Sequence, residues 1–390
     1  MTDVPTSQAP DSEDQPVLPL LGDPARFAQG WPRTPYRRVG TAAPLRSVLS
    51  WSDLDDLVNR RTLQTPAFRM ARNGSVLPIG TLTRAPHTTT QNVTGLADSA
   101  AILRELGEGA TLILQGLNRS WSPIGALSRR LSSEIGHAVF VNAYLTPRAT
   151  QGFGAHQDSQ HAWLVQCQGS KTWQLWAPDD DPEHDPPDWT LQLDEGDVLW
   201  IPRGWWHSGS SGDRPSLHLT FAVWATTVQD VLKSLTSELA FEPALAEELP
   251  PRALHEAAAA RSAVGETAVR LAELLARTDV PGLTQRLLTT HLQRFDPLPG
   301  PDLAGALGVD DPMLHAHPEA VLHTAVDGPQ VRLRTADSEV VMTAEQAAAC
   351  RTLLARTGGF RPDERDRHRL GDKLLGQLVD ARLLCSGHHG

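Results

Sequence analysis

The sequence predicts an α+β protein in which a barrel or sandwich of short strands lies between helical segments. Three observations predict this class. Apolar-alternating runs broken by Gly, Pro and Asp fill residues 138–224, a texture typical of strands joined by turns. Helical periodicity precedes this stretch and returns after Thr226. The chain has 390 residues, enough for roughly two or three domains.

The composition indicates a folded protein and narrows its partners. Hydrophobic residues make up 40% and charged residues 21% of the chain, which argues against a mostly disordered protein. The net charge of -11 has the wrong sign for binding phosphate, so it disfavours nucleic acid as a partner and favours basic partners. We find no cleavable leader and no run of about 18 apolar residues. We therefore expect a cytoplasmic protein with no membrane partner.

The three cysteines carry little information about function. Cys167, Cys350 and Cys385 are widely spaced and form no CxxC pattern. They therefore encode neither a disulfide framework nor a zinc knuckle, and a reducing compartment fits them best.

The N-terminal part is expected to begin with a flexible arm. Residues 1–30 are rich in Pro, Asp, Ser, Thr and Gln, and such a segment cannot bury enough apolar surface to offset the entropy of ordering it. Capped amphipathic helices and one glycine-bounded strand follow. The predicted elements are a helix capped by Ser50, a helix over Ser99–Leu106 capped by Asp98, a strand over Ala110–Gln115 and a helix over Ile124–Ile135.

The central strands and the C-terminal half complete the predicted order of elements. Strands are expected at Val139–Leu145, Ala162–Cys167, Thr172–Trp176, Trp189–Leu193, Asp197–Ile201 and Leu217–Trp224. Ala- and Leu-rich helices with apolar stripes that need covering follow at Val228–Leu239, Ala253–Ala276 and Leu283–Phe295. The last stretch offers strands at Val331–Thr335 and Glu339–Thr343 and helices at Ala344–Ala355 and Leu370–Ala381, an order that resembles a winged-helix module.

One segment has the spacing of a metal site. His156 and Asp158 flank a single residue, and His207 follows 49 residues after Asp158, beyond a Pro-Arg-Gly turn. In an extended strand the first two side chains point the same way. Two imidazoles and one carboxylate on the same side of a metal form the facial triad of non-haem Fe(II) oxygenases. A bare His-x-Asp is common, but flanking Gly152 and Gly154 permit the close backbone approach of a barrel mouth.

A lysine on an apolar strand face predicts an anionic ligand. Lys171 directly precedes the expected strand Thr172–Trp176. If the strand is extended, Lys171 shares its face with Trp173 and Leu175. An ammonium on an inward face needs an anion, and a dicarboxylate such as 2-oxoglutarate supplies one. The alternative is a hairpin-edge lysine that reaches back to water.

The same alternation groups polar residues on two further strands. Asn142, Tyr144 and Thr146 share one face, and Ser216, His218 and Thr220 share another, which suggests a wet pocket. For His218, a hydrogen-bonded core histidine is an equally good interpretation. We expect His161 to be a loop histidine, with contact to a substrate as the alternative.

Together these motifs resemble a family. The stretches 142–147, 152–158, 169–173, 195–207 and 216–220 occur in the order typical of cupin-type JmjC oxygenases related to ribosomal oxygenases. The resemblance is clearest over about residues 110–225. It implies a double-stranded β-helix barrel with flanking helices, a helical dimerisation region and a C-terminal winged-helix-like domain. The implied divisions are an arm (1–30), a JmjC/cupin catalytic domain (31–226), a helical dimerisation region (227–300) and a winged-helix-like domain (301–390).

The resemblance also implies an activity. In the family pattern, His156, Asp158 and His207 bind Fe(II), and Lys171 holds the distal carboxylate of 2-oxoglutarate, near Asn142, Tyr144 and Ser216. The implied enzyme is a dioxygenase that uses O2 and 2-oxoglutarate to hydroxylate a protein or peptide side chain, including those of basic ribosomal proteins. An acidic surface would attract such partners. A homodimer is implied as well.

The sequence departs from the family pattern at two positions near the metal site. His161 stands where relatives often have an acid, and Gln157 stands where an apolar or aromatic residue is common. These departures leave iron binding intact and put the substrate in doubt. The loop Asp179–Asp188, with His184 among its acids, is interpreted as solvated rather than as a second metal site.

Two alternatives stay open at this point. A JmjC-type N-methyl demethylase would use the same iron site. A non-enzymatic cupin regulator would instead need a basic recognition helix for DNA, but the arginines from Arg361 to Arg369 are interleaved with Asp363, Glu364 and Asp366.

Overall fold

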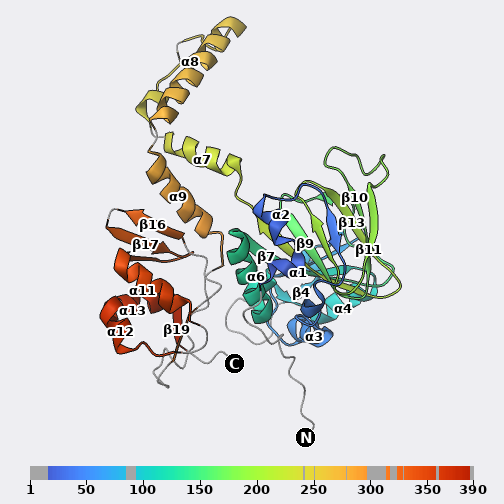
Figure 1. Cartoon of the computed structure of the whole chain (residues 1–390). Helices are drawn as coiled ribbons and strands as arrows, with labels where there is room; N and C mark the ends of the chain where they lie inside the picture. Colours follow the sequence, from blue (N-terminus) through green and yellow to red (C-terminus); the bar gives the residue numbers. More distant parts are fainter. Residues whose placement is uncertain are drawn as a thin grey trace. The chain divides into compact units, whose positions relative to one another are not determined.

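The computed structural model describes residues 16–84, 94–239, 242–249, 251–277, 279–296, 313–316, 323–327, 329–356 and 360–386 (Figure 1). The chain forms two compact units, Met1–Ala225 and Thr226–Gly390. Within the described residues, no helix is long and apolar enough to cross a membrane.

Two antiparallel sheets dominate the first unit (Figure 1). The larger sheet has the order β1 (Tyr36–Arg38), β12 (Val198–Ile201), β9 (His161–Gln168), β14 (Ser216–Trp224), β7 (Ala138–Thr146), β6 (Thr111–Leu114), β2 (Phe68–Arg72) and β3 (Ser75–Val76). The smaller sheet has the order β11 (Trp189–Leu193), β10 (Lys171–Trp176), β13 (Trp206–Ser211) and β8 (His156–Gln157). A separate two-stranded pair joins β4 (Thr83–Arg84) to β5 (Leu96–Ala97). The predicted central strands are thus confirmed.

Alternation along the strands separates two apolar layers. On β9 and β12, Trp163 and Trp200 belong to the main core beneath the helices. The neighbouring Leu164 and Leu199 instead pack with Trp173 in a second cluster shared by the two sheets. The interior between the sheets is therefore apolar over part of its length, and members of this second cluster also line the cavity described below.

The predicted helices of the first unit are also confirmed. Ser50 caps α3 (Trp51–Asn59) in a capping box with Asp53, and Asp98 caps α4 (Ser99–Gly107). In each helix, a side chain thus accepts a hydrogen bond from a backbone N–H group of the first turn that has no partner within the helix. The remaining helical segments are α1 (Leu18–Leu21), α2 (Pro24–Ala28), α5 (Leu117–Ser120), α6 (Ser122–Ile135) and the 3-10 turns Ala43–Leu45 and Ile79–Thr81.

Residues 16–30 are expected to belong to a flexible arm, but the structure packs part of this segment against the core. Val17 and Leu21 are buried in the main core, and the carboxylate of Glu134 accepts hydrogen bonds from the backbone N–H groups of Val17 and Leu18, each at 2.7 Å. The apolar cluster Val17–Leu21 is short, but Glu134 on α6, which is distant in sequence, holds its backbone in place. Residues 1–15 of the expected arm lie outside the described residues.

The second unit contains helices followed by a small sheet and further helices. Its helices are α7 (Val228–Leu239), α8 (Ala257–Ala276), α9 (Val280–Leu292), α11 (Ala344–Leu354), α12 (Glu364–Leu370) and α13 (Asp372–Asp380), with a 3-10 turn at Pro243–Leu245. Strands β16 (His323–Asp327), β17 (Gln330–Arg334) and β18 (Glu339–Thr343) form one antiparallel sheet, and β15 (Leu314–Ala316) pairs with β19 (Leu384–Ser386). The predicted strand pair and its following helices are confirmed as elements.

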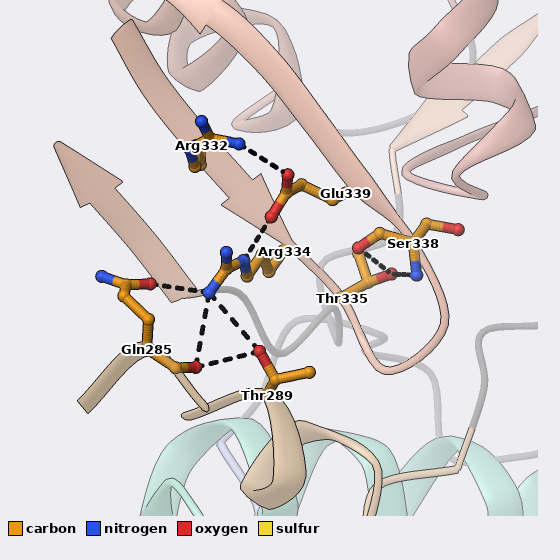
Figure 2. A network of polar contacts seen from close by, with 7 residues as sticks. All are labelled: Gln285, Thr289, Arg332, Arg334, Thr335, Ser338 and Glu339. Atoms are coloured by element: carbon orange, nitrogen blue, oxygen red, sulfur yellow. Dashed lines mark hydrogen bonds and ion pairs between the residues drawn. The ribbon is translucent and has the colours of Figure 1, made fainter. Parts of the chain in front are cut away.

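A polar network joins α9 to the sheet within this unit (Figure 2). The Arg334 guanidinium on β17 donates to the side-chain oxygen of Gln285 at 2.6 Å and pairs with Glu339 on β18. Arg332 adds a second ion pair to Glu339 at 3.0 Å. These contacts lower the pKa of Glu339, chiefly through the hydrogen bond from Arg334.

Candidate metal centre and adjoining cavity

Two neighbouring strands bring the predicted metal ligands together. His156 on β8 is the direct antiparallel partner of His207 on β13, and Asp158 follows β8 by one residue. One possible ligand atom from each residue lies within 4.8 Å of the others. In the described part of the chain, this is the sole group of three His, Cys, Asp or Glu side chains with that geometry.

Backbone carbonyls select the histidine tautomers that a metal requires. His156 Nδ1 lies 2.9 Å from Gly154 O, and His207 Nδ1 lies 3.1 Å from Trp205 O. Because a carbonyl oxygen only accepts, each Nδ1 carries the proton and each Nε2 keeps a lone pair. His207 Nε2 stands 3.6 Å from Asp158 Oδ2.

The charge state of the site also suits a metal. Burial, reinforced by neighbouring His156, lowers the pKa of His207 to about 4, so its imidazole is neutral near pH 7. The Asp158 side chain is 45% exposed, which leaves one side of the group open. Two imidazoles and one carboxylate are a ligand set that fits a divalent first-row metal with free coordination positions.

Gln157, between two of these residues, has a role that the sequence analysis missed. Its Nε2 donates to Gly204 O at 2.8 Å and to Pro178 O at 3.1 Å. The Gly204 N–H in turn donates to Asp158 O at 2.9 Å. These bonds tie the two-residue strand β8 to the turn that precedes His207. The available signal was the outward-facing polar side chain between the two candidate ligands.

The three residues open into a cavity between the two sheets. Its wall includes Leu164, Trp173 and Ile201 on the apolar side, and Tyr144, Lys171, His218 and Thr220 as polar groups. A dry wall with a few convergent polar groups is typical of a small-molecule site.

Lys171 supplies the cavity with a buried cation. The residue is 4% exposed, its Nζ donates to Thr146 Oγ1 at 3.1 Å, and no carboxylate forms an ion pair with it among the described residues. Burial lowers the pKa of its ammonium from 10.5 to about 7. Such a group fits an anionic ligand, and the predicted inward orientation is confirmed.

Gly209 makes room for that lysine. It faces Trp173 across β10 and β13, and a Cβ at this position would lie 2.8 Å from Lys171 Cε and 2.9 Å from the Trp173 ring. Only a residue without a side chain therefore lets the lysine stem lie flat against β13.

The other predicted cofactor residues divide into two groups. Tyr144 lines the cavity, and its pKa is raised by burial and then by Asp158. Asn142 and Ser216 do not belong to the cavity wall. Asn142 Oδ1 accepts from Gly116 N at 3.0 Å, and Ser216 Oγ accepts from Gln166 Nε2 at 2.9 Å. The structure thus turns both polar groups to protein partners.

The structure shows the surroundings of two further histidines, His161 and His184. His161 is the buried first residue of β9 and not a loop residue. Its ring stacks against those of Trp31 and Trp200, with centroids 4.8 and 5.3 Å away, and its Nδ1 accepts from Arg203 N. It does not line the cavity, so contact with a substrate there is not supported. His184 is 77% exposed and bonds to Asp181, in agreement with a solvated loop.

Comparisons with known proteins agree with this arrangement. Residues 121–231 match the family model of the JmjC domain. The chain is 32% identical over 154 residues to the bifunctional lysine-specific demethylase and histidyl-hydroxylase NO66 of Brugia malayi, covering 34% of this chain and 21% of that protein. It is 31% identical over 144 residues to ribosomal oxygenase 1 of Danio rerio, covering 33% of this chain and 26% of that protein. The chain thus spans less than a third of these relatives.

Solved structures show the same fold over nearly the whole chain. The ribosomal oxygenase YcfD of Escherichia coli matches with a TM-score of 0.57 at 15% identity, covering 94% of this chain and 98% of that one. Another YcfD structure, with a TM-score of 0.56 at 14% identity and the same coverage, is a complex with cobalt and 2-oxoglutarate.

Proposed function

Since this chain contains a JmjC domain and is related to NO66 and the ribosomal oxygenases, we propose that it is a 2-oxoglutarate- and Fe(II)-dependent oxygenase that hydroxylates a protein or peptide side chain. One observation carries the proposal. A cavity with a metal-type triad in its wall also contains a buried lysine that forms no ion pair within the described chain.

The position of each residue in the cavity determines its proposed binding role. His156, Asp158 and His207 would hold Fe(II), and Lys171 would bind the distal carboxylate of 2-oxoglutarate, with Tyr144 beside it. Bound Fe(II) supplies the reaction with O2, in which 2-oxoglutarate becomes succinate and CO2 and one substrate C–H becomes C–OH. The chain's own part is to orient the reactants, while Leu164, Trp173 and Ile201 keep water from the cosubstrate.

The proposed substrate is a basic protein. The names of the relatives point to ribosomal proteins and to histidyl or lysyl side chains. The net charge of -11 favours basic partners. Gln157, which lies between His156 and Asp158, donates to Pro178 O, and Pro178 directly precedes the acidic loop Asp179–Asp188. A basic substrate would therefore be attracted toward the cavity mouth. A cytoplasmic location fits such a substrate.

The first test is succinate formation by the purified protein with Fe(II), ascorbate and 2-oxoglutarate, with and without basic ribosomal proteins. Turnover stimulated by those proteins is expected. Turnover that instead releases formaldehyde from a methylated substrate would identify a demethylase. If 2-oxoglutarate neither binds nor turns over with metal present, the protein is better explained as a non-enzymatic cupin regulator.

We further propose that the helical region after the catalytic domain forms a homodimer. Helix α8 has no buried residue along its 20 positions in the described structure, and Val264 and Val269 are 65% and 61% exposed. An apolar helix surface of this kind needs a cover, and a second copy of the chain provides one. The C-terminal strands and helices would form the winged-helix-like domain.

Charge introduced on α8 tests the dimer. We expect Val269→Asp to halve the mass measured by light scattering on a sizing column, because a carboxylate would be buried without a partner. Glu273→Gln on the same helix is the control and should leave the mass unchanged. A wild-type protein that is monomeric at all concentrations would contradict the proposal.

The titration of Lys171 gives a pH prediction. Its pKa is about 7 without a ligand, so above pH 7 the amine is mostly neutral, and a bound dicarboxylate would restore its charge. We expect binding of 2-oxoglutarate at pH 8.5 to take up about one proton, and binding at pH 6 to take up almost none. Calorimetry in buffers of different ionisation enthalpy measures this uptake, and Lys171→Met should abolish it. Equal uptake at the two pH values would contradict the assignment.

A further inference from the structure

A buried histidine deep in the first unit has a ring nitrogen without a partner. His218 on β14 is 1% exposed, and its Nδ1 has no hydrogen-bond partner among the described residues. Buried polar atoms are nearly always satisfied, so the interpretation of His218 as a hydrogen-bonded core histidine does not hold for this nitrogen. The residue lines the same cavity as Lys171.

Two aromatic neighbours hold the imidazole in one orientation. Its ring is stacked on Tyr144, with centroids 4.8 Å apart and planes 6° apart, and it meets Trp173 edge-on at 5.3 Å and 88°. Tyr144 is also its direct partner across β7 and β14. Tyr144 therefore covers one face of the ring, and Nδ1 is left without a hydrogen-bond partner among the described residues.

The serine two residues before this histidine is engaged by a protein partner instead of lining the cavity. Strand β14 keeps a regular register with β7, in which Ser216 faces Thr146 and His218 faces Tyr144, so both side chains lie on the same face of β14. Ser216 accepts from Gln166 instead and lies outside the cavity wall. The position that the family resemblance assigns to the cosubstrate is thus already occupied by a protein contact.

We propose that His218 is a second binding residue for the distal carboxylate of 2-oxoglutarate, beside Lys171 and in place of Ser216. The inference rests on the proposed function. A carboxylate has several acceptor positions, so it can accept from the lysine ammonium and from an imidazole N–H together. His218 is neutral near pH 7, because burial and then neighbouring Lys171 lower its pKa well below the usual range. A neutral imidazole can donate here without adding a second buried positive charge.

This arrangement predicts selectivity for the second carboxylate of the cosubstrate. A 2-oxo acid without that group would leave the lysine and the imidazole unpaired at the end of a dry cavity, which is costly. 2-Oxobutanoate is such an acid, and it would use only the interactions at the metal end. His218 should therefore distinguish the two acids, whereas a residue that only shapes the cavity would affect both.

The test compares the binding of the two acids. In His218→Phe the aromatic stacking is kept and the N–H is lost. With Mn(II) in place of Fe(II) and without O2, calorimetry should show that the Kd for 2-oxoglutarate rises roughly tenfold. The Kd for 2-oxobutanoate and the Kd for Mn(II) should stay unchanged. His218→Gln, which retains a donor, should recover part of the loss and serves as the second variant if the first fails to fold.

Ser216→Ala is the matched control, and it should leave the Kd for 2-oxoglutarate within about twofold of wild type. An unchanged Kd in both His218 variants, an equal loss for both acids, or a larger loss in Ser216→Ala than in His218→Phe would overturn the inference. These results leave the proposed function standing, because wild-type protein still binds 2-oxoglutarate with metal. Wild-type protein that binds no 2-oxoglutarate would overturn the proposed function itself.

Discussion

Replacement of Asp158 by Ala is expected to lower succinate formation below about one-thousandth of the wild-type rate, because the proposed metal would lose its single carboxylate ligand. The free energy of unfolding should change by less than about 0.5 kcal/mol, since the side chain is 45% exposed and lies outside the core. The two quantities are measured by a succinate assay and by denaturant unfolding of the metal-free protein.

Asp213→Ala is the matched control for this change. Asp213 is an exposed aspartate in the loop between β13 and β14, so its replacement removes the same charge at the end of β13 that lies away from His207. It should retain turnover. Loss of folding in Asp158→Ala would indicate that the group has a structural role, and retained turnover would remove Asp158 from the metal site.

Lys171→Met is the second change with a large expected effect. It should raise the Kd for 2-oxoglutarate about 100-fold, because truncating one partner of a buried charge pair leaves the other unpaired. Binding of Mn(II) should not change. Titration calorimetry with each ligand separates the two effects.

The same variant weakens ligand binding, but it is not expected to lower the stability of the unliganded protein. In the unliganded protein, the Lys171 ammonium is buried without a carboxylate among the described residues, which is unfavourable. Met of similar length should therefore leave the unliganded protein as stable as wild type or more stable. Thr172→Ala on the other face of β10 is the control for both measurements. A strongly destabilised Lys171→Met protein with unchanged 2-oxoglutarate binding would show that the lysine supports the fold instead.

Alternation along strands explains which parts of the site could be predicted from the sequence. Lys171 and Tyr144 lie on regular strands, so counting by two places them in the cavity as expected. The same count gives the face of Ser216 correctly, but it does not show that Gln166 on β9 donates to its hydroxyl and that Ser216 lies outside the cavity wall. Asn142 faces the expected side, but its amide oxygen is taken up by Gly116 in a turn distant in sequence.

Long-range contacts account for the remaining differences in the fold. The expected arm is too polar to fold alone, yet Val17 and Leu18 are fixed by Glu134, more than one hundred residues away. Gln157 was noticed only as a departure from the family pattern, whereas its two backbone acceptors come from separate turns. Local patterns predicted the capped helices well, because caps such as Ser50 with Asp53 are contained within four residues.

The most direct test of the central claim is mass spectrometry of basic ribosomal proteins after incubation with the enzyme, Fe(II), 2-oxoglutarate and heavy-isotope O2. The account predicts that one side chain gains a single heavy oxygen atom in step with succinate formation, and that Asp158→Ala gives neither product. Labelled water as the source of the oxygen, or succinate formation without any labelled protein, would contradict a protein hydroxylase.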